Sequence, residues 1–187
     1  MRRHIFPKAY ADFVARLRVF LGFMMVVAFG YFSHPSALSL SIGLPISVCG
    51  LALRAWAAGH LRKNEALAES GPYAFTRNPL YLGTFIASLG FAAASRSLAL
   101  AILFAVVFLL VYLPAIELEE QHLRAILPGY EAYAAHVPLI TPRLILAGLH
   151  ATQPFSFAQY RNNREYEALL AWCAAAAWLV ARLIFQF

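Results

Sequence analysis

The sequence predicts an all-α integral membrane protein with about five transmembrane helices. Of its 187 residues, 61% are hydrophobic and only 13% are charged, whereas a soluble domain carries about 25% charged residues. The mean hydropathy of +0.65 shows the same bias. So little charge cannot cover a water-soluble fold, and a chain this rich in bulky apolar side chains does not stay disordered. The composition therefore excludes a soluble enzyme and favours a single membrane domain over residues 1–187.

Five apolar segments have about the length of a bilayer-spanning helix. A helix rises ~1.5 Å per residue and the hydrocarbon core is ~30 Å thick, so a span takes about 20 residues. Residues 1–18 contain five basic residues and no small-residue cleavage site. We therefore expect an amphipathic interfacial segment that leads into a retained anchor. The five expected spans are residues 17–32, 38–58, 79–94, 98–116 and 168–187.

Basic residues gather on one side of the expected bilayer. Five lie before or at the start of the first span, three lie between the second and third, and four lie between the fourth and fifth, so twelve of the 15 share a side. Cytoplasmic loops are enriched in Lys and Arg. This places the N-terminus in the cytoplasm, the C-terminus outside, and any chemistry on the cytoplasmic face of the cell (inner) membrane. The net charge of +6 then reflects topology, and we expect no nucleic-acid partner.

The polar segment before the third span contains a turn followed by a helix start. In Ser70-Gly71-Pro72-Tyr73, the glycine tolerates positive φ and the proline fixes the next residue. Asn78-Pro79 then begins a helix, with Asn78 as its N-cap. The N–H groups at such a start can hold a carboxylate. A re-entry turn with interfacial tyrosines is the alternative interpretation.

The second polar segment opens with acidic residues at the end of an apolar helix, where negative charge is disfavoured. Glu120 can form an i,i+4 pair with Arg124. Glu117 and Glu119 have no such local partner and could bind the cationic part of a ligand. Pro128-Gly129-Tyr130 then breaks the helix.

Taken together, these fragments resemble the isoprenylcysteine carboxyl methyltransferase and phospholipid methyltransferase superfamily. The resemblance covers roughly residues 53–142, and its members are integral membrane enzymes that use S-adenosylmethionine and release S-adenosylhomocysteine. It divides the chain into an N-terminal segment with two spans (1–58), a methyltransferase-like core with a helical hairpin (59–142) and a C-terminal extension with the fifth span (143–187). The fragments are Ser70-Gly71-Pro72-Tyr73, Arg77-Asn78-Pro79-Leu80-Tyr81-Leu82-Gly83, Glu119-Glu120 and Gly129-Tyr130-x-x-Tyr133-x-x-x-Val137-Pro138.

The resemblance implies a cytoplasmic cofactor pocket between the two polar segments. A helix start suits the carboxylate of the cofactor, and acidic side chains suit its ammonium and sulfonium groups. The chain departs from the family at Asn78, where a histidine is usual, and at His136, where the family often has a basic residue before Val-Pro. The implied cofactor-binding residues are His60, Asn64, Leu67, Gly71, Tyr73, Asn78, Pro79, Tyr81, Leu82, Glu119 and Glu120.

Methyl transfer to an activated carbon mainly needs alignment of the acceptor and exclusion of water. A carboxylate acceptor needs no base, whereas an amine must first lose its proton. His136 is the best titratable candidate for that proton, and a solvated or capping histidine is the alternative. The candidate catalytic residues are His136, Tyr133 and Arg164.

Two further charged positions have alternative interpretations. Arg164 or Glu165, just before the fifth span, could reach back over the acceptor site, or the patch could contact anionic lipid. Arg54 could line the pocket or extend its guanidinium to the membrane interface. Cys49 and Cys173 form no metal-ligand pattern. We expect them to be small buried residues, and we expect no metal site.

The sequence therefore predicts an S-adenosylmethionine-dependent membrane methyltransferase. Its acceptor would be lipid-like or apolar, such as an isoprenylcysteine carboxylate or a phospholipid amine, with membrane lipids around it. A membrane reductase of related fold and a non-enzymatic membrane scaffold are the two alternatives.

Overall fold

All regular structure in the described part of the chain is helical. The computed structural model describes residues 6–63, 65–142 and 153–185, the side chains of residues 18 and 19 excepted. The elements are α1 (Lys8–Phe32), α2 (Ala37–Ala58), the 3₁₀ turn η1 (Gly71–Ala74), α3 (Pro79–Ser95), α4 (Leu98–Val107), the π-helical turn η2 (Phe108–Tyr112), α5 (Leu113–Ile126), α6 (Tyr130–His136), α7 (Phe157–Asn162) and α8 (Tyr166–Phe185).

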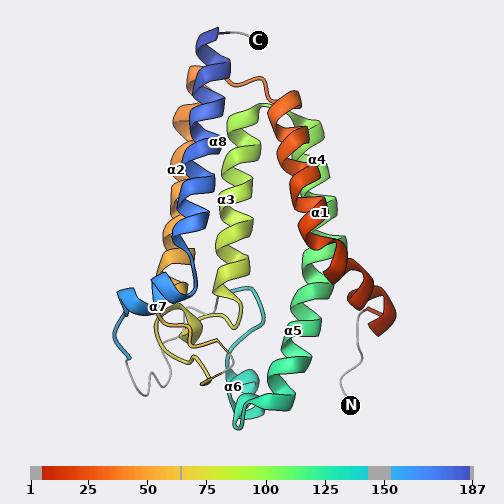
Figure 1. Cartoon of the computed structure of the whole chain (residues 1–187), viewed down its shortest axis with the longest axis vertical. Coiled ribbons are helices and arrows are strands. Elements are labelled where there is room, and N and C mark those ends of the chain that lie inside the picture. The colour runs from red at the N-terminus through yellow and green to blue at the C-terminus, as the bar shows by residue number, and fades with distance from the viewer. Residues whose placement is uncertain (1–5, 64, 143–152, 186–187) are drawn as a thin grey trace.

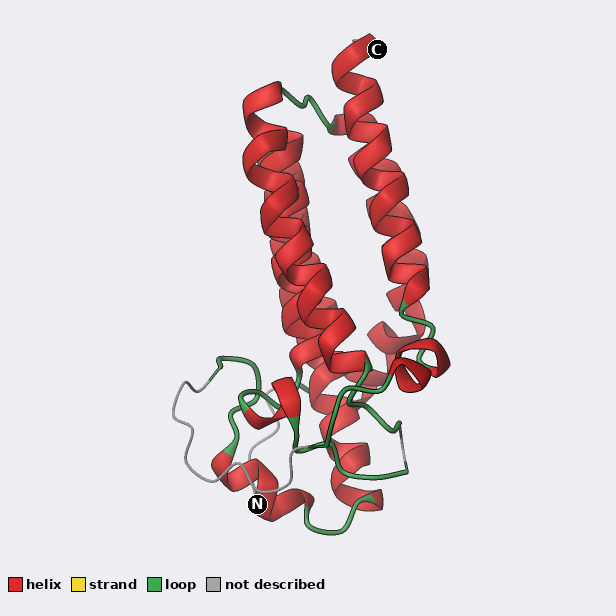
Figure 2. Cartoon of the chain, turned by 90° about the vertical axis from the view of Figure 1, so that its left-hand side faces the viewer, coloured by secondary structure: helices red, strands yellow, loops and turns green. Residues whose placement is uncertain are grey.

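The long helices lie side by side along the long axis of the molecule (Figure 1). The α1–α2 and α3–α4 connections and the end of α8 lie at one end of this bundle. The N-terminal end of the chain, α6, α7 and the irregular segments lie at the other end, and Figure 2 shows the same arrangement from the side. The two polar segments that the sequence singles out therefore meet at one end of the bundle.

The predicted class, an all-α membrane protein, is confirmed. Helix α2, the continuous run Leu98–Ile126 and α8 are long and apolar enough to cross a membrane, with 22, 29 and 20 residues. The pair Lys8–Leu17 and Phe20–Phe32, bent by 53°, would be a fourth span. Helix α3 is apolar but has only 17 residues. A count of five needs both the bent pair and α3 to cross, so it stays a prediction.

Helix α1 begins at Lys8, nine residues before the expected start of the first span. The bend separates an N-terminal part from the apolar part, and this agrees with an interfacial segment ahead of an anchor. The hydroxyl of Tyr10 in the first part donates to the carbonyl of Leu110, at 2.7 Å. That carbonyl lacks its α-helical donor because residue 114 is a proline, and a π-helical turn precedes this proline.

Helices α2 and α3 pack closely enough for their backbones to touch. A Cβ placed on Gly50 would lie 2.3 Å from the backbone nitrogen of Ala87, and one on Gly90 would lie 2.3 Å from that of Ser47. Only glycine permits this approach, as at small-residue contacts between membrane helices. The prediction that Cys49 and Cys173 are buried is wrong, because both are exposed on the outer surface of the bundle.

Candidate functional site

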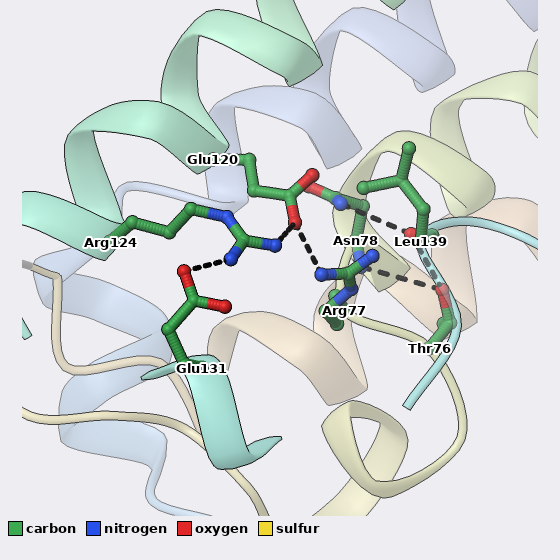
Figure 3. Close-up of polar contacts among 7 residues, drawn as sticks. All are labelled: Thr76, Arg77, Asn78, Glu120, Arg124, Glu131 and Leu139. Atoms are coloured by element: carbon green, nitrogen blue, oxygen red, sulfur yellow. Dashed lines mark hydrogen bonds and ion pairs between the residues drawn. The ribbon is translucent and has the colours of Figure 1, made fainter. Parts of the chain in front are cut away.

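The polar end of the bundle is held together by hydrogen bonds between segments 73–78 and 133–140. The hydroxyl of Tyr133 donates to the carbonyl of Tyr73 at 2.7 Å. The backbone N–H of Arg77 donates to the carbonyl of Pro138 at 2.9 Å. Asn78 occupies the N-cap position of α3 as predicted, but its side chain does not cap the helix: Nδ2 donates to the carbonyl of Leu139 at 3.1 Å (Figure 3). These bonds place the start of α3 against the α6 region.

A cleft lies between the start of α3, the end of α5, α6 and the loop after α2, and we call it the cofactor-side cleft. Glu119 of α5 and Asn78 at the start of α3 both line it. A ligand shared by the two polar segments needs both residues at one cleft. Its full lining is Leu61, Arg62, Lys63, Ala66, Leu67, Ala68, Tyr73, Arg77, Asn78, Pro79, Leu80, Tyr81, Glu119, Leu123, Leu127, Tyr130 and Tyr133.

Within the cleft, Glu119 and Tyr81 form one unit. The hydroxyl of Tyr81 donates to Oε2 of Glu119 at 2.8 Å. Glu119 is exposed. Among the described residues no hydrogen bond reaches its Oε1. The pair therefore presents a carboxylate oxygen and an aromatic ring at the cleft.

Glu120, the neighbouring acid, is not among the residues that line the cleft and takes part in a chain of ion pairs. Its Oε1 accepts from Nη1 of Arg77 and from Nη2 of Arg124, the latter at 2.7 Å (Figure 3). Arg124 also pairs with Glu131, and its guanidinium lies 5.4 Å from the ring centre of Tyr130. The side chain of Arg77 is only 5% exposed. The expected i,i+4 pair is thus present, and Glu120 additionally neutralises a buried arginine.

Three buried tyrosines around the cleft remain protonated at neutral pH. Burial, reinforced by the charges of Glu119 and Glu165, raises the pKa of Tyr73. Burial also raises the pKa of Tyr133. Burial together with the nearby charge of Glu120 raises the pKa of Tyr130 to about 12. A tyrosine with a raised pKa donates a hydrogen bond but does not serve as a base. Tyr133 therefore acts here as a fixed donor to the Tyr73 carbonyl.

The remaining predicted cofactor-binding residues lie at different distances from the cleft. Leu67, Tyr73, Pro79 and Tyr81 line it with Asn78 and Glu119. His60 lines an adjoining hollow that shares Leu67, and its ring packs against Gly71, whose φ is +60°. Leu82 lies outside the lining, and Asn64 lies outside the described residues.

The other predicted catalytic residues lie apart from the cleft. His136 is exposed and lines a separate open groove with Arg77 and Pro138. Arg164 is exposed at the start of α8 and pairs with Glu167. Neither is brought together with Glu119 or Asn78.

Glu165 and Arg54 form a fork-like ion pair beside this region. Nε and Nη2 of Arg54 donate to the two carboxylate oxygens of Glu165 at 2.6 and 3.0 Å. The guanidinium also contacts the hydroxyl of Thr84 on α3. Arg54 therefore turns inward between helices, and its pair with Glu165 lies close enough to influence the pKa of Tyr73.

Several lining residues were not singled out from the sequence. Leu123 and Leu127 continue the face of α5 that carries Glu119, at intervals of four residues. This helical spacing is a signal that the sequence offered. Tyr130 stands in one of the quoted fragments. The loop residues Leu61, Arg62 and Lys63 show no pattern that marks them, because their position depends on tertiary contacts.

Comparison with known proteins identifies the family of the chain. Residues 17–129 match the phospholipid methyltransferase (PEMT) family. The cobalt-zinc-cadmium resistance protein CzcN of Cupriavidus metallidurans is 32% identical over 137 residues, 72% of this chain and 62% of that protein. The nickel-cobalt-cadmium resistance protein NccN of Alcaligenes xylosoxydans xylosoxydans is 31% identical over 130 residues, 68% of this chain and 61% of that protein.

The chain thus spans less than two thirds of the length of these curated relatives. No solved structure matches it. The family match covers more than half of the chain and includes the start of α3 and the acidic end of α5. The chain belongs to the phospholipid methyltransferase family, a family of membrane methyltransferases.

Proposed function

We propose that this protein transfers a methyl group from S-adenosylmethionine to a lipid-like or apolar acceptor. The observation that carries the proposal is the convergence of the α3 start and the Glu119–Tyr81 pair on one cleft. Glu119 and the start of α3 come from segments about 40 residues apart in the sequence and offer complementary charges to one ligand.

The chemistry of the cleft fits this cofactor. The first turn of α3 has backbone N–H groups without helical partners, and such a turn attracts a carboxylate. Glu119 offers negative charge to an ammonium group, and the ring of Tyr81 offers a π-face to a cation. Leu67, Leu123 and Leu127 supply apolar walls for a nucleoside.

The cleft must widen before a molecule of the size of S-adenosylmethionine can enter it. Its volume is about 70 Å³, well below the ~300–1,000 Å³ of typical small-molecule sites. The walls on the side of α3, α5 and α6 are helical, whereas residues 61–63 and 65–68 belong to an irregular loop. Cofactor binding would therefore move Ala66, Leu67 and Ala68 outward, beyond the part of the loop that begins at Leu61.

The residues of the chain would bind and align the reactants. The bound cofactor supplies a methyl group already activated by its sulfonium sulfur. The hydroxyl of Tyr81 holds the Glu119 carboxylate in place, and the protonated Tyr133 of α6 holds the segment before α3 through the backbone carbonyl of Tyr73. Alignment and exclusion of water are the main needs of this transfer.

We propose that the cleft faces the cytoplasm at the inner membrane and that the acceptor arrives from the bilayer. The positive-inside bias of the polar segments supports this orientation. Two relatives are named as metal resistance proteins. In the part of the chain that the structure describes, no three His, Cys, Asp or Glu side chains are grouped to hold a metal ion.

Calorimetric titration of the full chain in lipid nanodiscs with S-adenosylmethionine tests the proposal. Replacing Glu119 by Gln removes a charge-assisted contact worth ~1.5–3 kcal/mol, so Kd should rise about tenfold or more. Glu167→Gln, the same change at an exposed position on α8, serves as the matched control and should bind like the wild type. Absence of binding by the wild type, or equal binding by Glu119→Gln, would refute the proposal.

Transfer itself is measured with cofactor labelled in the methyl group. Label should move into the organic extract of vesicles that contain the protein and a phospholipid amine or a prenylated carboxylate. A parallel titration with NADPH tests the reductase alternative, which gains support only if NADPH binds and S-adenosylmethionine does not.

A further inference from the structure

The turn between α7 and α8 reaches the loop that forms one wall of the cofactor-side cleft. This turn consists of residues 163–165 and lies beyond the family match, which ends at residue 129. Arg164 adopts a left-handed conformation with φ of +56° and has an exposed side chain. Its neighbours Asn163 and Glu165 both face the protein.

Asn163 fastens the start of the loop. Its Nδ2 donates to the carbonyls of Ala58 and Leu61, each at 2.9 Å. The carbonyls in the last turn of a helix lack intrahelical donors, so the amide satisfies the end of α2 and the first part of the loop together. Leu61 and the two residues after it line the cleft.

Two further contacts hold the same point. The backbone N–H of Ser156 donates to the carbonyl of Gly59 at 2.9 Å. The ring of Phe155 lies so close to Gly59 that a Cβ there would be 2.1 Å from it. The segment before α7 therefore packs directly on the first residue of the loop.

Glu165 fixes the turn to the rest of the bundle. It is 6% exposed and pairs with Arg54, which also contacts Thr84 on α3. Asn163 thus lies in a turn that is fixed to α2 and α3 by the ion pair of Glu165. Its two hydrogen bonds can therefore hold the loop in place.

We propose that Asn163 is a positioning residue that sets the loop wall of the cofactor-side cleft. It acts through Leu61 and the adjoining lining residues and does not touch the cofactor. The proposal rests on the proposed function for its ligand, while the contacts that carry it come from the fold. Loss of the two bonds should loosen the loop and weaken cofactor binding, with little change in the transfer step.

Asn163→Asp is the sharpest variant, because an ionised carboxylate cannot donate to the two carbonyls. Asn162→Asp, an equal change at the exposed neighbouring residue, is the matched control. We expect Kd and KM for S-adenosylmethionine to rise about tenfold in Asn163→Asp, with kcat within about twofold and the control unchanged. Asn163→Ser, which keeps one donor, should be intermediate and replaces Asn163→Asp if that variant does not fold.

A second readout needs no cofactor. Arg62 and Lys63 are exposed in the loop, so limited trypsin digestion followed by mass spectrometry reports its mobility. Cleavage there should be several-fold faster in Asn163→Asp than in the wild type and in Asn162→Asp. Equal cleavage rates would overturn the inference even if the wild type binds no cofactor. Faster cleavage with an unchanged Kd in a cofactor-binding wild type would also overturn it.

Discussion

The adjacent acids Glu119 and Glu120 should respond in opposite ways to the same substitution. Glu119 faces the cleft and is exposed, whereas Glu120 is 13% exposed and neutralises Arg77, itself 5% exposed. Changing each to Gln preserves size and removes one negative charge. Glu119→Gln should weaken cofactor binding with little effect on stability, and Glu120→Gln should lower stability.

The structure gives the magnitude for Glu120. Removing one partner of a buried ion pair costs ~3–5 kcal/mol. Nε of Arg77 is buried and has no hydrogen-bond partner among the described residues, so this side chain has little other compensation. Arg124 keeps Glu131, and the loss of an i,i+4 pair adds only ~0.3–0.5 kcal/mol. Because Gln keeps an acceptor oxygen, we expect Glu120→Gln to lower the free energy of unfolding by ~2–3 kcal/mol.

Reversible unfolding in mixed micelles, followed by circular dichroism, measures this loss. A double-mutant cycle with Arg77→Met isolates the ion pair, and the double variant should be more stable than Glu120→Gln alone because no buried charge is left unpaired. The reasoning is refuted if Glu120→Gln stays within ~0.5 kcal/mol of the wild type, or if Glu119→Gln is the more destabilising change.

Three further outcomes follow from the geometry. Gly50→Val should lower the unfolding free energy by several kcal/mol, since its Cβ would overlap the backbone of α3; near-native thermal stability would contradict the described packing. Tyr130, whose pKa is raised to about 12, ionises near pH 10 when unfolded. Its contribution is complete below pH ~10 and is lost as pH rises toward 12, so Tyr130→Phe should show a shallower fall in unfolding free energy between pH 9 and 11.5. Arg164→Gly removes the strain of a left-handed backbone, which costs ~1 kcal/mol, and loses an exposed ion pair that contributes less. The unfolding free energy should therefore stay the same or rise, and methyl transfer should be retained. A folded variant without transfer would show that Arg164 acts on substrate.

The helices, and the position of the two polar segments at the same end of the bundle, could be predicted from the sequence. Long apolar runs have few alternatives to a membrane helix, so all five expected segments are helical over their described residues. The sequence brought Asn78 and Glu119 together because each follows or precedes an expected span on the same side of the bilayer, and the ends of spans with short connections lie together. The structure places Glu119 inside α5, which continues to Ile126. The start of α1 at Lys8 was not predicted, because an amphipathic interfacial segment and the first turns of a longer helix have similar patterns of apolar and polar residues.

The sequence could not predict that Glu119 lines the cleft while Glu120 pairs with Arg77. Successive residues of a helix point about 100° apart, so the sequence shows that they face different ways but not which one faces the ligand. That depends on Arg77, which is 43 residues distant and is held by the carbonyl of Pro138. The same holds for Asn163 and Arg54, whose partners are separated by about 100 residues or more.

The segment that matches the family does not complete the cleft. Its match ends at residue 129, yet Tyr130 and Tyr133 line the cleft and the carbonyl of Leu139 holds Asn78. The loop wall depends in addition on Asn163, far beyond that boundary. The family-matched part supplies the charged groups that suit a cofactor, while the residues after it fix the distance between the walls. Changes in this later part can therefore alter how tightly a ligand is held without replacing any group that contacts it.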